Sequence, residues 1–209
     1  EAQGKHFTTA NSDTEVVLQL YASEGPAFVR RLNGMFAFVI FDRKQKRLFG
    51  ARDRFGIKPL YLHRHARDIA FASELKSLLA LPQVSREINP QSLYHYLTFL
   101  AVPDEASILQ HTTRLPPAHT FTFDCSTRKF TTDRFWSLDF SQTENRSVNE
   151  WAEAIRHGAE EAVQRWTLSD VPVACSLSGG IDSTAIVGML MQSGGRKLDS
   201  GNNRLVSSA

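Results

Sequence analysis

The stretch with the clearest chemistry is the run of small polar residues from Ser176 to Ser183. Its two adjacent glycines, Gly179 and Gly180, let the backbone turn sharply and approach a ligand without a Cβ in the way. A serine hydroxyl stands on each side of the glycines as a further donor. Amide groups at the start of a following helix favour an anion, and a carboxylate such as Asp182 suits a Mg²⁺ carried by a phosphate. The stretch is therefore a candidate phosphate-binding loop.

The elements that would position this loop are a strand before it and a helix after it. Residues 171–175 form a short apolar run, and residues 184–191 are apolar at helical spacing. The loop lacks the lysine of the common nucleotide-binding P-loop and the glycine pattern of a dinucleotide fold. A plain strand-to-helix turn, where Ser, Gly and Asp are common caps, also fits these residues.

The order Ser-Gly-Gly-x-Asp-Ser after a strand resembles the pyrophosphate loop of the PP-loop ATP pyrophosphatases. This resemblance implies ATP and Mg²⁺ as ligands. It places the Mg²⁺ on Asp182, and it implies that the backbone groups of Ser176 and Leu177 contact the nucleotide. The pyrophosphate would be held by Ser178, Gly179, Gly180 and Ser183.

Composition excludes several other classes of protein. The chain has 209 residues, is 42% apolar and carries a formal net charge of +2, with basic and acidic residues interspersed. That pattern gives enough apolar residues for a core and predicts no nucleic-acid or membrane partner. Cys125 and Cys175 form no close pair, and no run reaches membrane-spanning length. Free thiols in the reducing cytoplasm are the expected setting.

Local patterns predict the elements of the first part of the chain. Ser12 and Glu15 are spaced as a capping box at the start of a helix. Residues 35–41 are apolar at every position, which predicts a central strand covered on both faces, and residues 47–51 would return from it as a hairpin. The charged residues that follow, Arg52 to Pro59, are interpreted as a surface loop with an exposed salt bridge.

Later in the chain, a polar segment at 141–149 precedes a predicted amphipathic helix. Its apolar stripe is expected to be core. The stripe comprises Val148, Trp151, Ile155, Ala159, Ala162, Val163 and Trp166.

Three motifs in the first part occur in a fixed order, at residues 32–38, 51–61 and 72–76. Together they resemble the C-terminal half of a class II glutamine amidotransferase domain. Joined to the later Ser-Gly-Gly-Ile-Asp-Ser loop, they resemble the glutamine-hydrolysing asparagine synthetases from about residue 13 to about residue 191. The implied fold is a partial N-terminal-nucleophile (αββα) sandwich over residues 1–140. The start of a parallel-sheet PP-loop domain would follow over 141–209, with a disordered tail from about residue 193.

This resemblance implies an ATP-dependent carbon–nitrogen ligase that adenylates aspartate and uses glutamine as the amide donor. Its small-molecule partners would be glutamine, aspartate and ATP, and a homodimer is left open. The family's N-terminal cysteine nucleophile is absent, because Glu1 opens the chain and neither Cys125 nor Cys175 fits that role. No catalytic residue is therefore assigned, and the chain by itself is expected not to hydrolyse glutamine.

Asp13 has two interpretations. Its position suits helix capping, and the matching aspartate of the family binds the α-amino group of glutamine. Two alternatives remain for the whole chain. One is a related amidotransferase or β-lactam-synthetase-like enzyme acting on another carboxylate. The other is a truncated, non-catalytic ATP-binding module.

Overall fold

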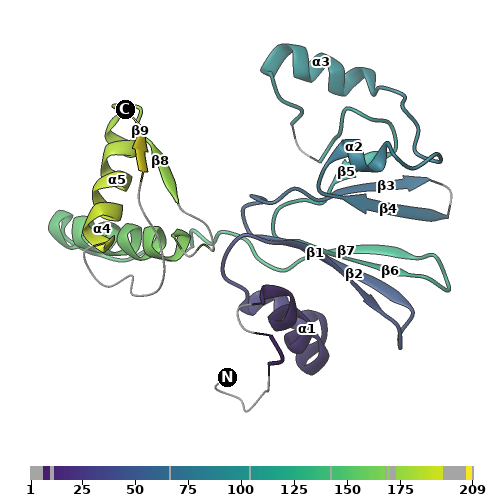
Figure 1. The fold of residues 1–209 in the computed structure, drawn as a ribbon, viewed down its shortest axis with the longest axis horizontal. Helices are drawn as coiled ribbons and strands as arrows, with labels where there is room; N and C mark the ends of the chain where they lie inside the picture. Colours follow the sequence, from purple (N-terminus) through teal and green to yellow (C-terminus); the bar gives the residue numbers. More distant parts are fainter. Residues whose placement is uncertain are drawn as a thin grey trace. The chain divides into compact units, whose positions relative to one another are not determined.

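The computed structural model of the chain describes residues 7–9, 12–65, 67–103, 105–141, 143–167, 169, 173–194 and 206–208. The chain divides into two units, Glu1–Asp139 and Phe140–Ala209. The first unit contains two antiparallel sheets, one of four strands and one of three, whereas the second contains a short parallel pair (Figure 1).

In chain order, the helices and strands of the first unit are α1 (Asp13–Glu24), the 3₁₀ helix η1 (Gly25–Arg31), β1 (Ala37–Asp42), β2 (Arg47–Arg52), β3 (Tyr61–His65), β4 (Asp68–Ala72), α2 (Leu75–Leu78), α3 (Pro90–Phe99), β5 (Thr112–Arg114), β6 (His119–Asp124) and β7 (Phe130–Arg134). The second unit contains α4 (Val148–Trp166), β8 (Ala174–Ser176), α5 (Ile181–Gly194) and β9 (Val206–Ser208).

The predicted hairpin is present as β1 and β2, and the four strands of this sheet are ordered β1-β2-β6-β7. Both faces of β1 are in contact with other layers. Ala37 and Val39 pack on one apolar cluster, whereas Phe38 and Ile40 belong to another. The expectation of two covered faces was right, but the expected central place was wrong, because β1 is an edge strand of the described sheet. Cover by layers above and below is enough to select an all-apolar strand, whatever its place in the sheet.

Two apolar clusters define the layers of the first unit. The first joins Leu62 of β3 to Phe121 and Phe123 of β6, so the three-stranded sheet β4-β3-β5 packs face to face on the four-stranded sheet. The second joins Phe49 of β2 to Phe28 of η1, with residues of α1 packed around them. Helices therefore cover the four-stranded sheet on its other face, and α2 lies against β4 (Figure 1).

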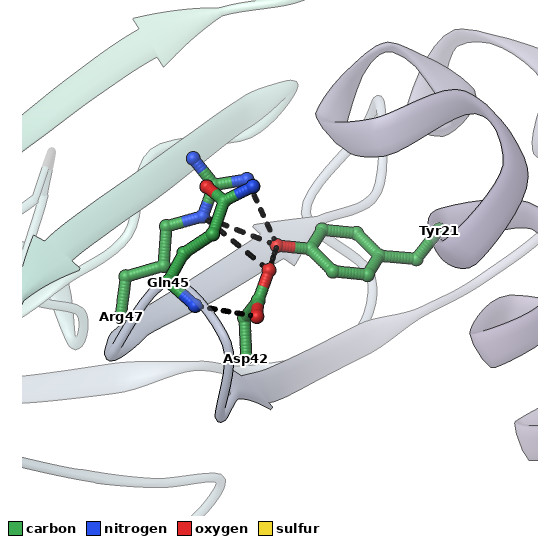
Figure 2. Close-up of polar contacts among 4 residues, drawn as sticks. All are labelled: Tyr21, Asp42, Gln45 and Arg47. Atoms are coloured by element: carbon green, nitrogen blue, oxygen red, sulfur yellow. Dashed lines mark hydrogen bonds and ion pairs between the residues drawn. The ribbon is translucent and has the colours of Figure 1, made fainter.

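The hydroxyl of Tyr21 attaches α1 to the β1–β2 hairpin. It donates to Asp42 Oδ2 over 3.1 Å and accepts from Arg47 Nε over 3.2 Å (Figure 2). The amide of Gln45 donates to Asp42 Oδ1 over 3.0 Å, and this bond is the largest cause of the lowered pKa of Asp42. Burial raises the pKa of Tyr21. The network fixes the helix over the sheet while keeping the Asp42 carboxylate paired.

The segment after β2 is not the surface loop with an exposed salt bridge that its sequence suggested. Asp53 is only 1% exposed and Arg52 is also buried. The Asp53 carboxylate accepts hydrogen bonds from four backbone amides, those of Phe36, Phe55, Ile57 and Lys58, at 2.9–3.3 Å. The Arg52 guanidinium donates to the carbonyls of Lys58, Leu115 and Gly56. Both charges are therefore used inside the fold to hold the loop.

In the second unit, α4 begins with a full capping box between Ser147 and Glu150. The prediction that its apolar stripe is core was wrong for the described chain, since α4 has no buried residue, and Val148, Ile155 and Trp166 are exposed. The predicted strand, tight loop and helix are present as β8, the residues 177–180, and α5. The apolar run expected as a strand from Val171 lies partly outside the described residues. Within the described part of the chain, no helix is both long and apolar enough to cross a membrane.

The end of the chain is described in part. Helix α5 extends to Gly194, and β9 pairs in parallel with β8. The predicted disordered tail from about residue 193 falls mostly on 195–205, which lie outside the described residues.

Candidate functional site

The candidate phosphate-binding loop joins the last residue of β8, Ser176, to the first residue of α5, Ile181. Gly179 has a φ of 76°, in the left-handed region that only glycine adopts without strain. Among the described residues, no neighbouring atom excludes a larger residue, because a Cβ on Gly179 would meet nothing within 4 Å. The glycine thus serves the backbone conformation of the turn and is not required by a crowded neighbour.

Hydrogen bonds inside the loop bring its two serine hydroxyls together. Ser178 Oγ lies 2.9 Å from Ser183 Oγ. The Gly180 carbonyl accepts from Ser183 Oγ at 3.0 Å, and from the amide and hydroxyl of Thr184 at 3.1 and 2.8 Å. This carbonyl begins the hydrogen bonding of α5, and the two serine side chains face the turn.

The loop amides are largely unused. The Gly180 amide makes one long contact of 3.4 Å to Ser178 Oγ. Among hydrogen bonds between described residues, none uses the amide of Gly179, Asp182 or Ser183. The loop is also open to solvent, since Leu177 is 51% and Ile181 is 87% exposed. Unused amide donors at a helix start, open to solvent, are what an incoming phosphate requires.

Asp182 lies in the first turn of α5, beside the loop, and is exposed. Within the described residues, no group of three or more His, Cys, Asp or Glu side chains could hold a metal ion. A Mg²⁺ site formed by protein ligands alone is therefore not indicated there. Mg²⁺ commonly takes one carboxylate, with phosphate oxygens and water as its other ligands, and Asp182 fits that arrangement.

The second site predicted from the sequence, Asp13, lines a cavity of about 560 Å³ in the first unit. Helix capping is done by its neighbour Ser12, whose hydroxyl accepts from the Glu15 amide. No hydrogen bond or ion pair between described residues uses the Asp13 carboxylate. The remaining lining comes from α1 (Thr14, Val17 and Leu18), from the β1 region (Met35 to Phe41) and from Lys58, Pro59 and Ser73 later in the chain.

The second half of the predicted capping box, in which the Glu15 carboxylate would accept from the Ser12 amide, is not seen among the described hydrogen bonds. The Glu15 carboxylate accepts hydrogen bonds from the amides of Thr8 and Thr9, at 2.7 and 2.8 Å, and from both hydroxyls. The Thr9 hydroxyl and then the Thr8 amide are the largest causes that lower the pKa of Glu15 to about 2. Glu15 therefore holds the segment before α1, and Asp13 is left to face the cavity.

Beyond α1, two polar cavity residues, Lys58 and Ser73, were not predicted as site residues. The Lys58 backbone is fixed by Asp53 and Arg52, through its amide and its carbonyl. Both residues belong to motifs of the glutamine amidotransferase resemblance, which was the available signal for them. Neither cysteine lines the cavity, since Cys125 follows β6 and Cys175 lies within β8.

Comparison with known protein families gives two matches. Residues 1–136 match the glutamine amidotransferase domain family, and residues 154–200 match the asparagine synthase family. The second match contains the whole loop from Ser176 to Ser183.

Most of the chain is similar to curated proteins, of which two are named asparagine synthetases and one an amidase. The chain is 34% identical over 190 residues to a putative glutamine-hydrolysing asparagine synthetase 2 of Methanocaldococcus jannaschii, covering 88% of this chain and 36% of that protein. It is 38% identical over 189 residues to the glutamine-hydrolysing asparagine synthetase 1 of Bacillus subtilis, covering 90% and 29%. It is 35% identical over 187 residues to the amidase chry2 of Gibberella zeae, covering 86% and 26%. The chain thus spans between 26% and 36% of the length of these relatives.

Proposed function

Because the chain belongs to the glutamine amidotransferase domain family, we propose that it takes part in an ATP-dependent ligase reaction in which glutamine supplies the amide nitrogen. The acceptor we assign is aspartate and the product is asparagine. The asparagine synthase match of residues 154–200 and the names of the two bacterial and archaeal relatives support this assignment.

In this reaction, the aspartate β-carboxylate attacks the α-phosphorus of ATP and releases pyrophosphate. Ammonia from glutamine then displaces AMP and forms the amide. The loop amides, with the hydroxyls of Ser178 and Ser183, would hold the β- and γ-phosphates, while the backbone of Ser176 and Leu177 meets the nucleotide. Mg²⁺ on Asp182 would neutralise part of the phosphate charge.

In the first unit, Asp13 would bind the α-ammonium group of glutamine. The basis is an exposed carboxylate at the start of α1 that lines a cavity large enough for an amino acid and has no partner among the described residues. A charge-assisted hydrogen bond between carboxylate and ammonium is about twice as strong as a neutral one. The two free thiols suit a reducing cytoplasmic setting, which we propose for the protein.

The observation that carries the proposal is the open loop with its unused amides and its paired serine hydroxyls. The test is Mg-ATP binding to the chain, measured by calorimetry and by the shift in melting temperature. ATP and pyrophosphate should bind, and AMP, which lacks the pyrophosphate, should bind much more weakly. Asp182→Ala should remove most of the Mg-dependent gain, whereas Glu153→Ala, at an exposed carboxylate of α4, should leave it unchanged. Equal binding of AMP and ATP would exclude pyrophosphate recognition by this loop.

The glutamine assignment has a separate test. Asp13→Asn should weaken glutamine binding by about tenfold or more, because a hydrogen bond to a charged group is lost. A glutamine analogue without the α-amino group should bind the wild-type chain weakly. Asp13→Asn should cause no further loss in the affinity for this analogue. If the variant weakens both ligands equally, Asp13 does not contact the amino group.

A further inference from the structure

Basic side chains distant in sequence meet at one end of the first unit. They lie in or beside the three strand connections β1–β2, β3–β4 and β6–β7, which Figure 1 shows on the same side of the two sheets. All of them are exposed. This surface, the basic end, consists of Arg43, Lys44, Lys46, Arg64, Arg67, Arg128 and Lys129.

Direct contacts hold the three connections together. The Cys125 amide donates to the Lys46 carbonyl over 2.9 Å, which joins the β1–β2 and β6–β7 turns. Arg128 Nη1 donates to the Arg67 carbonyl over 3.4 Å, which joins β6–β7 to β3–β4. The Arg64 guanidinium lies 4.3 Å from the centre of the Phe130 ring. The basic end is therefore one continuous surface of the folded unit.

The charge of this surface is not cancelled locally. Asp42 is held by Tyr21 and by the Gln45 amide, and Asp124 accepts from the amides of Ser126 and Thr127 at 2.9 and 2.7 Å. Only Asp68 is well exposed among the described acidic residues of these connections, at 3.6 Å from Arg128. Seven of the chain's 24 lysines and arginines gather at this end, although the whole chain carries a net charge of only +2. The remainder of the chain is therefore net acidic.

Backbone conformation adds an independent observation. Lys46 and Arg128, one in each of two hairpin turns, have positive φ values of 48° and 61°. This left-handed conformation is a regular part of hairpin turns, where glycine or asparagine adopts it at least cost. Both turns have a long basic side chain at that position.

An apolar row lies directly beside the basic turns. Phe41, Leu48, Phe123 and Phe130 are neighbours across the four strands. Phe41, at one end of the row, is 55% exposed. Arg43 and Lys44 follow Phe41 in the next turn of the chain. A partly exposed aromatic ring next to basic side chains is typical of a protein–protein interface, which has an apolar centre and a polar rim.

We infer that the basic end is a docking surface for an acidic polypeptide segment that carries an apolar side chain for Phe41. Phe41 favours a polypeptide over duplex nucleic acid, because a peptide can supply an apolar side chain to the exposed ring whereas the outer surface of a duplex presents phosphates. Among the described residues of these connections and the row, Phe41 is the only exposed Phe, Tyr or Trp, whereas single-stranded nucleic acid binds on several stacking platforms.

The test measures binding of a short glutamate-rich peptide that contains one leucine. Duplex DNA of equal charge, and phosphatidylcholine vesicles with phosphatidylserine, serve as the competing probes. The peptide should bind most tightly at the same salt concentration, and more weakly as salt rises. The combined variant Lys44→Gln, Lys46→Gln, Arg67→Gln and Lys129→Gln should weaken peptide binding by about tenfold or more.

A matched control changes the net charge equally at sites outside the basic end, with Lys76→Gln, Arg86→Gln, Arg134→Gln and Arg156→Gln. Phe41→Ser should weaken binding of the leucine-containing peptide but should not weaken binding of a leucine-free peptide. The melting temperature of each variant checks that it is folded. Equal weakening by the control variant, or tighter binding of DNA or vesicles than of peptide, would overturn the inference.

Discussion

Ser178 Oγ lies 2.9 Å from Ser183 Oγ, across the turn that joins β8 to α5. Ser183 Oγ also donates to the Gly180 carbonyl over 3.0 Å, so the proton shared by the two serines comes from Ser178. Neither hydroxyl is used by another element of the described chain. A phosphate that enters the turn can replace this bond with two hydroxyl contacts, without moving α5.

Ser183→Ala should therefore weaken Mg-ATP binding by about tenfold, the value of one hydrogen bond to a charged phosphate. Calorimetric titration of the chain measures the change. Thr184→Val is the matched control, because Thr184 also donates its hydroxyl to the Gly180 carbonyl but lies one residue further along α5. Equal weakening in both variants would show that the effect comes from the start of α5 and not from phosphate contact.

Asp53→Asn should destabilise the first unit by about 2–4 kcal/mol. The carboxylate receives four backbone amides, and an asparagine NH₂ group would face two of them without an acceptor. Denaturant unfolding measures the loss in free energy. Asp68→Asn, at a carboxylate whose side chain is 77% exposed, should change it by less than about 0.5 kcal/mol. A small effect at Asp53 would mean that its loop is held by other contacts.

Gly50→Ala should destabilise the four-stranded sheet by about 3 kcal/mol or more, because a Cβ there would lie 2.1 Å from Phe121 Cε1. Gly158→Ala, in α4 with no atom within 4 Å of the new Cβ, should instead stabilise the chain by about 0.5–1 kcal/mol. Thermal and denaturant unfolding of the two variants provide the comparison. Stabilisation by Gly50→Ala would contradict the packing of β2 against β6.

The free energy of unfolding should decrease as the pH falls below 6.5, the ordinary histidine pKa, because of His63. Its Nδ1 is bonded to Thr112 Oγ1 at 3.0 Å, while its buried Nε2 has no partner among the described residues. Burial lowers the pKa of His63 from its ordinary 6.5, and His111 and His65 lower it further. Well above pH 6.5 the ring is neutral in both the folded and the unfolded chain. As pH falls, the unfolded chain takes up the proton first, so the free energy of unfolding decreases until the folded-state pKa is passed.

The measurement is denaturant unfolding between pH ~7.5 and ~5.5. His63→Gln should remove most of the decline in this range, whereas His157→Gln, at an exposed position of α4, should not. Carboxylates with lowered pKa values, Glu15 among them, act at lower pH and do not enter this range. An unchanged decline in His63→Gln would assign it to another group.

Several local features were predicted correctly because short-range physics decides them. Ser12 caps α1, the hairpin of β1 and β2 forms, and a strand, a glycine turn and a helix surround the loop at Gly179. Each depends on residues within a few positions of one another. The assignments of Asp13 and Asp182 to glutamine and Mg²⁺ remain predictions, with geometry that suits them.

Other features were wrong or unseen because they depend on residues far apart. Arg52 and Asp53 have the composition of an exposed loop, but their partners include Leu115 and Phe36, and these contacts bury the charges. The stripe on α4 has a core pattern, yet no described element covers it fully. The interspersed charge along the chain gave no sign of a basic surface, whereas three connections bring seven basic residues to one end of the unit.

The sequence alone determined the order of its elements, the glycine turn and its donors, and the motifs that identify its family. These are set by side-chain size, by backbone freedom and by periodicity, which act along the chain. Only the tertiary structure decided which charges are buried, which cavity Asp13 lines, and which basic residues become neighbours. Those outcomes follow from strand pairing and layer packing, which join residues that no local pattern connects.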